Sequence, residues 1–473
     1  MAVHGGNSLQ SNRRAIRSNI LAGHSLATTF SIASAHAQTW FELLAQSGVI
    51  YSNNSSWLFN IAVNIATYGD QPLSCNQSPW ELFLIFLRLG LTSFGGPIAH
   101  LGYFRQEFVE RRKWLSESAY ADLVSLCQFL PGPASSQMGI GLGLSRGGIP
   151  GAIASWLGFT LPSAILLVLF GRGLSFFGNS LGNGWLHGLK IAAVAVVAQA
   201  LWGMGKNLCP DKMRASFALG AAIIATLIPT SLGQVSAILA SGILGWSLLP
   251  DASIPQHGVI QTRTGKKTGA VLLMVFALLL VVLPIWGNEL DSSVIKFFDI
   301  FYRAGSLVFG GGHVVLPLLQ SQVIPTGRVS PDVFLAGYGV AQAVPGPLFT
   351  FAAYLGAVSN QPPSGLIGAG IALIAIFLPS FLLVIGIIPF WEQLRRYKGI
   401  QRVLIGINAG VVGILLVAFY NPVWTSAIHS PIDFCLAAFA FLILVFWKLP
   451  PWLVVAVAAV ISELLETHLF TNS

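Results

Sequence analysis

Two short motifs rich in glycine and proline interrupt apolar segments, and each motif occurs twice in the chain. A helix that is broken inside lipid persists only where protein or a water-filled cavity covers its free backbone groups. Such a break exposes helix N-termini, whose N–H groups and dipole attract anions. Because both motifs are duplicated, we favour an anion site over simple kinks through which small residues pack closely. The motif residues are Phe94, Gly95, Gly96 and Pro97, matched by Gly310, Gly311 and Gly312, and Pro131, Gly132 and Pro133, matched by Pro345, Gly346 and Pro347.

An arginine lies inside the apolar segment that leads to each glycine motif. Arg88 and Arg303 occupy equivalent positions, since 303 − 88 = 215 is also the offset between the two glycine motifs. An arginine within the membrane is costly and is by default a functional candidate. Two roles stay open: contact with an anion, or an internal ion pair, with Asp299 for Arg303 and with Glu81 for Arg88.

Uncharged polar side chains near the motifs are further candidates. His100 and His313 flank the glycine motifs without being equivalent in the repeat. Either suits a proton relay or an anion contact, with hydrogen-bonded packing as the alternative. Gln128 and Gln342 are equivalent, and each stands three residues before a Pro-Gly-Pro motif. Amide donors suit a dehydrated oxyanion, and hydrogen bonding between helices is the alternative.

A basic stretch follows the first glycine motif and ends at Trp114. It is amphipathic, which is typical of an interfacial helix whose long cationic side chains reach toward water. The other interpretation is a funnel that gathers anions. The cations of this basic stretch are Arg105, Arg111, Arg112 and Lys113.

The composition of the chain excludes a soluble enzyme. Only 9% of its 473 residues are charged and 54% are hydrophobic, whereas soluble domains carry about a quarter charged residues. The net charge of +8 is typical of basic cytoplasmic loops and does not indicate nucleic-acid binding. The four cysteines are scattered, and no nucleotide-binding or metalloprotease motif occurs. We therefore expect no cofactor, no metal site and no enzyme activity.

Long uncharged runs predict an all-α polytopic membrane protein with about 13 transmembrane segments. Residues 1–79 are polar and predict a flexible extension, with a cleaved signal segment as the alternative. Residues 80–250 form a first repeat, 251–293 a linker with one extra membrane helix, and 294–473 a second repeat. The expected segments lie near 81–103, 120–145, 150–171, 186–205, 215–230, 233–250, 268–286, 296–321, 331–358, 364–391, 402–420, 431–447 and 450–467.

The order of the motifs indicates an internal duplication with inverted repeats. The tripeptide ending at Ser163 recurs at Ser380, and this landmark follows the other two motifs in both halves. Six segments per repeat and one linker helix make an odd number, so the second copy enters the membrane inverted. Basic residues in the even-numbered loops, Arg395 and Arg396 among them, place the N-terminus in the cytoplasm. The basic stretch contradicts this assignment unless the first two segments are re-entrant, which the sequence leaves open.

The motif-bearing segments resemble a known family. FGGPIAHLGYFRQEFVERRKWL, followed by YADLVSLCQFLPGPASSQMG, is similar to the signature of the chromate ion transporter family. YRAGSLVFGGGHVVLPLL and GYGVAQAVPGPLFTFAAYLG are similar to the C-terminal pattern of its long, two-domain form. The resemblance covers residues 80–470. It implies a secondary transporter of the bacterial cytoplasmic membrane that exports chromate with the proton motive force and confers chromate resistance.

Other functions stay open beside this one. Chromate and sulfate are both tetrahedral dianions, so a sulfate or other oxyanion permease is the main alternative. A channel is a further alternative, whereas a membrane-embedded reductase would need a flavin, haem or metal site that the residues do not suggest. The expected partners are the substrate anion and the lipid bilayer, a homodimer is left open, and no nucleic acid is expected.

Overall fold

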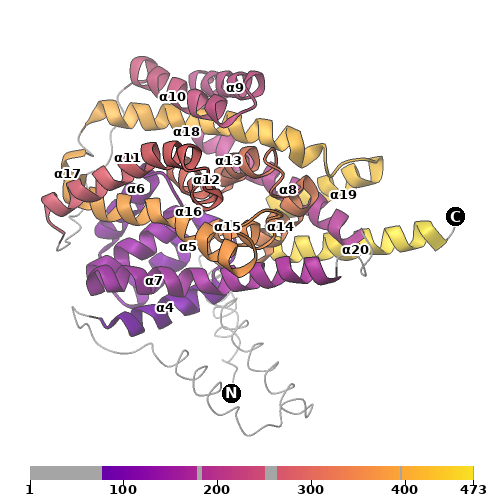
Figure 1. Ribbon diagram of the computed structural model, residues 1–473, viewed down its shortest axis with the longest axis horizontal. Helices are drawn as coiled ribbons and strands as arrows, with labels where there is room; N and C mark the ends of the chain where they lie inside the picture. The colour runs from indigo at the N-terminus through magenta and orange to yellow at the C-terminus, as the bar shows by residue number, and fades with distance from the viewer. Residues whose placement is uncertain (1–76, 178–183, 251–263, 395–396, 472–473) are drawn as a thin grey trace, which may run out of the picture. The chain divides into compact units, whose positions relative to one another are not determined.

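The computed structural model describes residues 77–177, 184–250, 264–394 and 397–471, and the ordered elements in these ranges are helices (Figure 1). The expectation of an all-helical membrane protein is thereby confirmed. The expected N-terminal extension lies outside the described residues as far as residue 76, as do residues 251–263 of the linker and Arg395 and Arg396.

The elements of the first half and the linker follow one another in a simple order. They are α4 (Pro79–Thr92), α5 (Gly96–Arg105), the π-helical turn η1 (Gln106–Arg111), α6 (Glu117–Phe129), α7 (Ala134–Phe177), α8 (Gly184–Leu208), α9 (Lys212–Leu227), α10 (Ser231–Leu248) and α11 (Lys266–Glu289). The backbone of α7 leaves helical geometry at Gly148, so α7 consists of two helices on either side of this residue.

The second half repeats this order, with more short 3₁₀ and π-helical turns between its helices. Its elements are α12 (Ser293–Leu307), η2 (Gly312–Val314), α13 (Val315–Val323), α14 (Pro331–Ala343), η3 (Leu348–Thr350), α15 (Phe351–Ala357), α16 (Gly365–Ile387), η4 (Ile388–Phe390), α17 (Trp391–Leu394), α18 (Lys398–Ala418), η5 (Phe419–Trp424), α19 (Pro431–Leu442), η6 (Ile443–Trp447) and α20 (Pro451–Thr471).

Serine N-caps set the start of the first helix in each of four helix pairs. The side chains of Ser78, Ser116, Ser292 and Ser330 accept a backbone N–H from the first turn of α4, α6, α12 and α14. A capping serine satisfies one of the N–H groups that a helix start leaves free. These four starts are equivalent in the two halves, since 292 − 78 = 214 and 330 − 116 = 214.

The segment 81–103, expected to span the membrane, is a helical hairpin. The ring of Phe86 on α4 lies 5.8 Å from that of Phe104 on α5 and 5.2 Å from that of Phe108. In one continuous helix residues 86 and 104 would be about 27 Å apart. The chain therefore turns back after Thr92, and its two arms of 14 and 10 residues are each shorter than the roughly 30 Å hydrocarbon core.

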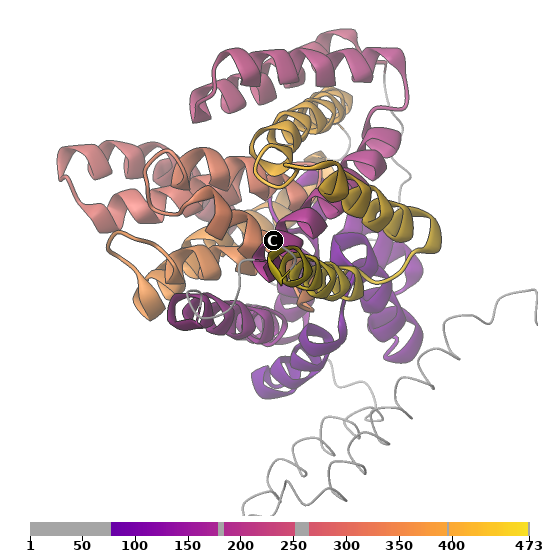
Figure 2. The ribbon, with the colours of Figure 1, turned by 90° about the vertical axis from the view of Figure 1, so that its right-hand side faces the viewer.

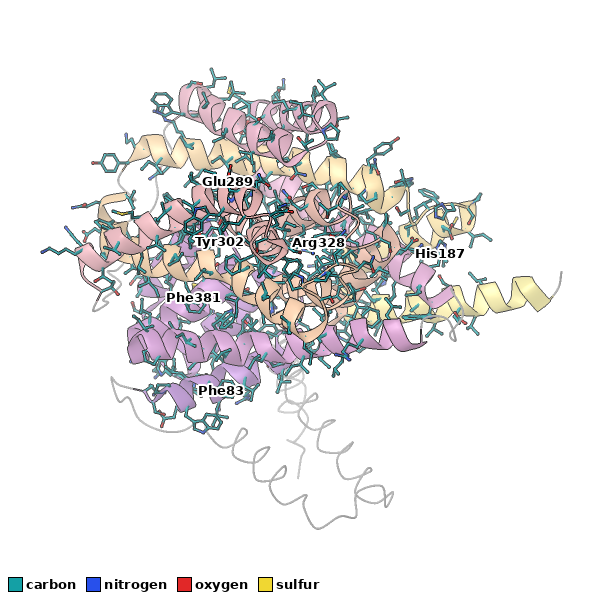
Figure 3. All side chains as sticks on the ribbon, viewed as in Figure 1. Phe83, His187, Glu289, Tyr302, Arg328 and Phe381 are labelled. Atoms are coloured by element: carbon teal, nitrogen blue, oxygen red, sulfur yellow. The ribbon has the colours of Figure 1, made fainter. Side chains whose placement is uncertain are left out.

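Three further segments fold back in the same way. A Cβ added to Gly141 would lie 3.0 Å from Leu123, on the preceding arm. The hydroxyl of Tyr354 donates to the carbonyl of Val333 over 2.8 Å. Arg328, which follows α13, donates to Ser293 at the start of α12 over 3.3 Å (Figure 3). The segments 120–145, 296–321 and 331–358 are thus also hairpins.

Other helices are long and apolar enough to cross a membrane. Among the described residues five such helices occur, and shorter apolar helices accompany them at Leu232–Leu248, Leu348–Ala357, Pro431–Trp447 and Pro451–Leu465. Large apolar side chains on α9, α10 and α11 are exposed, for example Leu227, Leu232 and Met274, which suits a surface that faces lipid. The five long helices lie within Ala134–Leu174, Gly184–Leu208, Lys266–Glu289, Gly365–Leu394 and Lys398–Trp424.

Glycines bring the hairpins into backbone contact with the long helices. Figure 1 shows α4 beside α7 and α9 with α10 beside α18, and Figure 2 shows α19 and α20 near α8. A Cβ on Gly158 of α7 would lie 2.4 Å from the carbonyl oxygen of Phe83 on α4. In the second half, a Cβ on Gly305 of α12 would lie 2.2 Å from the carbonyl oxygen of Ile376 on α16. Each first hairpin is therefore seated directly on a long helix.

This seating predicts that Gly158→Ala destabilises the protein. The added methyl group meets backbone that cannot rotate away, so the cost should be about 1–3 kcal/mol of overpacking. Gly173→Ala in the same helix α7 is the matched control, because its Cβ would have no described atom within 4 Å. Thermal unfolding of the purified proteins should show a lower midpoint for Gly158→Ala only. Equal unfolding midpoints for the two variants would contradict the close backbone contact between α4 and α7.

Candidate functional site

The tips of the four hairpins cross-link the two halves of the chain. The backbone N–H of Gly132 donates to the carbonyl of Val308 over 2.7 Å, and that of Gly346 donates to the carbonyl of Ser93 over 3.0 Å. The two bonds connect equivalent positions, since 346 − 132 = 214 and 308 − 93 = 215. The second hairpin of each half thus contacts the first hairpin of the other half, as a two-fold arrangement requires.

The first hairpins of the two halves also meet each other. A Cβ added to Gly312 would lie 3.3 Å from Cγ of Pro97. These two residues are equivalent, since 312 − 97 = 215. A residue that contacts its own equivalent lies close to the two-fold axis, so the glycine motifs of the two halves face each other there.

The cross-links leave helix N-termini as the free polar ends at the tips. Ser93 and Val308 end α4 and α12, and their carbonyls accept the glycine N–H groups just described. The arms that leave the tips start at Gly96, Ala134, Gly312 and Leu348. The first N–H groups of a helix have no acceptor within it and carry the positive end of the dipole. The tips therefore present N–H donors whose polarity suits an anion.

Two equivalent serines lie against the Pro-Gly-Pro tips. A Cβ on Gly346 would lie 2.8 Å from Oγ of Ser163 on α7, and a Cβ on Gly132 would lie 2.8 Å from Oγ of Ser380 on α16. Both serines are at most 1% exposed, and 380 − 163 = 217. Their hydroxyls add donors that can rotate toward an oxyanion.

Several buried polar atoms around the tips lack a hydrogen-bond partner among the described residues. They belong to side chains that are at most 1% exposed, where an unpaired polar atom costs about 1–3 kcal/mol. A buried polar group without a partner is a sign that a ligand or water completes it. These atoms are Oγ of Ser93, Nδ1 of His100, Oγ of Ser136, Oε1 of Gln137 and Oγ of Ser380.

The glycine tips leave open space beside their backbone. Gly96 and Gly311 have φ angles of +78° and +138°, a region that favours glycine. A Cβ at either residue would meet no described atom within 4 Å. Since 311 − 96 = 215, the open space occurs at equivalent places, and a ligand can approach the backbone there.

The two predicted arginines lie on the arms that lead to the tips. Arg303 on α12 donates to the carboxylate of Asp299, which is 6% exposed. This is the internal ion pair that the sequence left as an alternative. Arg88 on α4 is half-buried, and its charged neighbours are Glu107, Arg111 and Arg112. The structure thus brings both arginines near the hairpins, with a carboxylate partner for Arg303.

The histidines hold the tips in place. Nε2 of His100 lies 3.2 Å from the carbonyl oxygen of Ser93, and the ring packs edge-on against Phe159. Nδ1 of His313 lies 2.8 Å from the hydroxyl of Tyr338. Both contacts are the hydrogen-bonded packing given as the alternative role. His100 also contacts the same carbonyl that links the two halves.

The two predicted glutamines differ in their surroundings. Gln128 is exposed at the end of α6. Gln342 is half-buried, and its Nε2 has no partner among the described residues. The equivalence of the two positions in sequence is therefore not matched by equal burial.

The basic stretch is largely neutralised by carboxylates of its own neighbourhood. Arg105 pairs with Glu110 over 2.5 Å and with Glu117. Arg111 and Arg112 both pair with Glu107, over 3.3 and 2.6 Å. Lys113 takes part in no ion pair among the described residues. The pairing favours an interfacial element over a funnel that gathers anions.

Sequence reasoning missed the buried hydroxyls and Gln137. Ser163 and Ser380 were visible as a duplicated landmark but were not assigned to the site. Nε2 of Gln137 donates to the carbonyl of Pro131 over 2.7 Å and so supports the tip. Gln137 and Ser93 have no marked pattern in the sequence, and only folding brings them to the tips. Among the described residues no three His, Cys, Asp or Glu side chains gather as a metal site would require.

Comparisons with known proteins follow this geometry. The sequence model of a family described as chromate transporter matches residues 80–246 and 295–462. A relative from Synechococcus elongatus, named "Probable chromate transport protein", is 29% identical over 392 residues, which cover 80% of this chain and 94% of the relative. No solved structure matches the chain.

Two further relatives carry the name chromate transport protein. The protein from Pseudomonas aeruginosa is 27% identical over 71% of this chain and 79% of its own length. The protein from Cupriavidus metallidurans is 26% identical over 81% of this chain and 92% of its own length. The chain therefore spans most of each of these relatives.

The tip geometry predicts that Gly132→Ala and Gly346→Ala weaken oxyanion binding. Their φ angles are +125° and +107°, and the new Cβ would press on a serine hydroxyl. Strain of about 1–3 kcal/mol at each tip should weaken sulfate binding to the purified protein about tenfold or more. Gly370→Ala in α16 is the control, since its Cβ has open space. Unchanged sulfate affinity in both tip variants would place the site elsewhere.

Proposed function

This chain belongs to the chromate transporter family, and from that premise we propose that it exports chromate across the cytoplasmic membrane with the proton motive force. The protein is an integral membrane protein, and the named relatives that support the location come from bacteria. Export of chromate would confer chromate resistance. A permease for sulfate or another oxyanion is the alternative.

This proposal rests on the hairpin tips that meet between the two halves of the chain. A dianion that leaves water needs many donors, because an isolated ion in a low dielectric costs tens of kcal/mol. Four helix starts, the equivalent serines Ser163 and Ser380, and the unpaired hydroxyls of Ser93 and Ser136 supply donors in one place. Donors of this kind recognise any tetrahedral dianion, so the site separates chromate from sulfate only weakly. A buried site of neutral donors suits transport, which needs reversible binding.

We place the site between inverted repeats. The hairpins of the first half enter the membrane from the face on which we place the N-terminus, and they return to the same face. The second part of α7 and then α8, α9, α10 and α11 make five crossings, so the hairpins of the second half enter from the opposite side. The helices α16, α18, α19 and α20 add four crossings. In the described part of the chain, nine crossings and four re-entrant hairpins therefore take the place of the expected thirteen crossings in this proposal.

Contacts at the helix ends support this arrangement. Lys190, near the start of α8, pairs with Asp332 at the start of α14 over 2.8 Å. With thirteen crossings these residues would lie on opposite faces of the membrane, whereas re-entrant hairpins place them on the same face. The backbone N–H of Trp185 donates to Glu463, near the end of α20, over 2.8 Å. This contact also fits the nine-crossing arrangement.

The distribution of basic residues also fits the nine-crossing arrangement. The basic stretch now lies on the side of the N-terminus and no longer contradicts the positive-inside rule. The opposite side carries the few residues Arg172, Lys190, Lys296 and Arg328. The described basic residues on the cytoplasmic side are Arg105, Arg111, Arg112, Lys113, Arg146, Lys206, Lys212, Arg214, Lys266, Lys267, Lys398, Arg402 and Lys448.

Cysteine labelling distinguishes the two arrangements. In a variant without the natural cysteines, Ser118→Cys should react only with reagents in the cytoplasm and Thr326→Cys only with external ones. Thirteen crossings require the reverse at both positions. Reporters after Lys398 and Ser473 serve as controls, because both arrangements place the first in the cytoplasm and the second outside. Labelling of Ser118→Cys from outside would refute the hairpin arrangement.

Transport by the purified protein tests the function itself. In proteoliposomes with an imposed pH gradient, chromate flux should be inhibited by sulfate and molybdate in competition. Ser163→Ala and Ser380→Ala each remove a donor to a charged ligand, worth about 1.5–3 kcal/mol. Each should raise the Kd for chromate about tenfold or more. Ser216→Ala is the control, because its exposed hydroxyl bonds within α9. Absence of oxyanion flux in the parent protein would refute the proposed function.

A further inference from the structure

A cavity of about 620 Å³ lies apart from the hairpin tips. It is formed by α8, α14, α19 and α20, with Leu174 of α7 at its edge. Figure 3 labels His187 on α8, and Figure 2 shows α8, α19 and α20 at this place. Because α14 has 13 residues, its start in the cavity is about 20 Å from the tip that follows it. The polar residues that line the cavity are His187, Lys190, Asp332, Ser430, Asp433 and Ser462.

A histidine–carboxylate pair in this cavity connects the two halves of the chain. Nε2 of His187 on α8 lies 2.8 Å from Oδ1 of Asp433 on α19. The other carboxylate oxygen accepts the backbone N–H groups of His429 and Ser430 over 3.0 and 2.8 Å. A carboxylate only accepts hydrogen bonds, so Nε2 carries the hydrogen. The second ring nitrogen of His187 is then the place where a further proton binds.

Most of the remaining charged groups around the pair have partners of their own. Lys190 of α8 pairs with Asp332 of α14. Glu463 of α20 accepts the backbone N–H of Trp185, a hydrogen bond that leaves its negative charge in place. His429 stacks on His187 with 6.0 Å between the ring centres, so two imidazolium charges would repel each other. Arg172 of α7 is exposed and does not line the cavity.

These charges suit a proton better than an oxyanion. Of the two aspartates that face the cavity, Asp332 is paired with Lys190, so Asp433 leaves a negative charge that would repel a dianion. The side chain of His187 is 29% exposed, so water reaches it. Histidine changes its charge between about pH 5 and pH 8. Oγ of Ser462, in a residue that is 6% exposed, has no partner among the described residues and offers water a bonding site.

We propose that His187 and Asp433 form the proton-binding site that couples proton movement to oxyanion transport. The proton comes from external water, binds the free ring nitrogen of His187 and leaves the same atom for the cytoplasmic side once the carrier has opened inward, with no other bond made or broken. The inference rests on the proposed function. In the nine-crossing arrangement the cavity lies at the external face, where the proton motive force delivers protons.

The packing connects this pair to the hairpin tips. A Cβ on Gly339 of α14 would lie 2.6 Å from the carbonyl oxygen of Leu189 on α8, so the two backbones touch. The far end of α14 leads to Gly346, whose N–H joins the halves at Ser93. Protonation turns the bond between His187 and Asp433 into an ion pair and draws α8 toward α19. A shift of α8 is thereby passed along α14 to the tip, and linkage requires anion binding to act back on proton affinity.

The test compares two kinds of flux in proteoliposomes of the full-length protein. Chromate–chromate exchange without a gradient reports binding and release of the anion. Chromate flux under an imposed pH gradient reports coupling. In the parent protein the gradient should raise this flux at least about fivefold. His187→Gln should keep exchange within about twofold and lose the acceleration by the gradient. Asp433→Asn keeps the size of the side chain and should behave in the same way.

Asp211→Asn is the matched control. Asp211 also accepts a backbone N–H at a helix start, from Arg214 over 2.9 Å, but it lies outside the cavity. The Asp211→Asn protein should keep both chromate–chromate exchange and the acceleration of chromate flux by the pH gradient. Normal acceleration in a folded His187→Gln or Asp433→Asn protein would overturn the inference and leave the proposed function intact. A parent protein without acceleration would instead refute the proton coupling in the proposed function, and the inference with it.

Discussion

The fold depends on how the free backbone groups at the helix breaks are satisfied. In a membrane, a broken helix exposes N–H and C=O groups that water cannot reach. Here each half completes part of the breaks of the other, through the bonds from Gly132 to Val308 and from Gly346 to Ser93. Neither half can complete its own tips alone. The duplication is therefore a structural requirement, and the polar centre lies where the two halves meet.

This requirement explains why glycine and serine dominate the centre. The tips must pass close to each other and to the long helices, so residues without a side chain occupy the crossings, as at Gly132, Gly158 and Gly346. Close approach excludes bulky polar side chains, and the remaining donors are backbone N–H groups and short hydroxyls. Such donors are neutral, so in the proposed function they would hold a dianion without the permanent charge that slows its release. The arginines remain on the arms, where Arg303 already has Asp299 as its partner.

The sequence predicted the helical class, the duplication and the motif residues at the tips, because glycine and proline breaks in apolar runs have few other uses. It did not predict the hairpins. Two apolar arms joined at Gly95 have the same length and hydropathy as one continuous span, and only contacts such as Phe86 with Phe104 reveal the turn. It also missed Ser93 and Gln137, since burial depends on packing between distant segments. The charge of the basic stretch was the one sequence signal that disagreed with thirteen continuous spans.

The two halves repeat the same helices, but the titratable groups His187 and Asp433 are not repeated. This difference bears on the direction of transport. A symmetric pair of hairpin sets makes the two faces of the membrane nearly equivalent, which suits a carrier that opens to either side. His187 is the fourth residue of α8 and Asp433 the third of α19, whereas the matching places in α18 and α9 hold Gln401 and Arg214. The histidine–carboxylate pair therefore exists on one face only. In the proposed mechanism a proton gradient acts on the state open to that face and not equally on its counterpart, so the asymmetry of two side chains would give the carrier a preferred direction of transport.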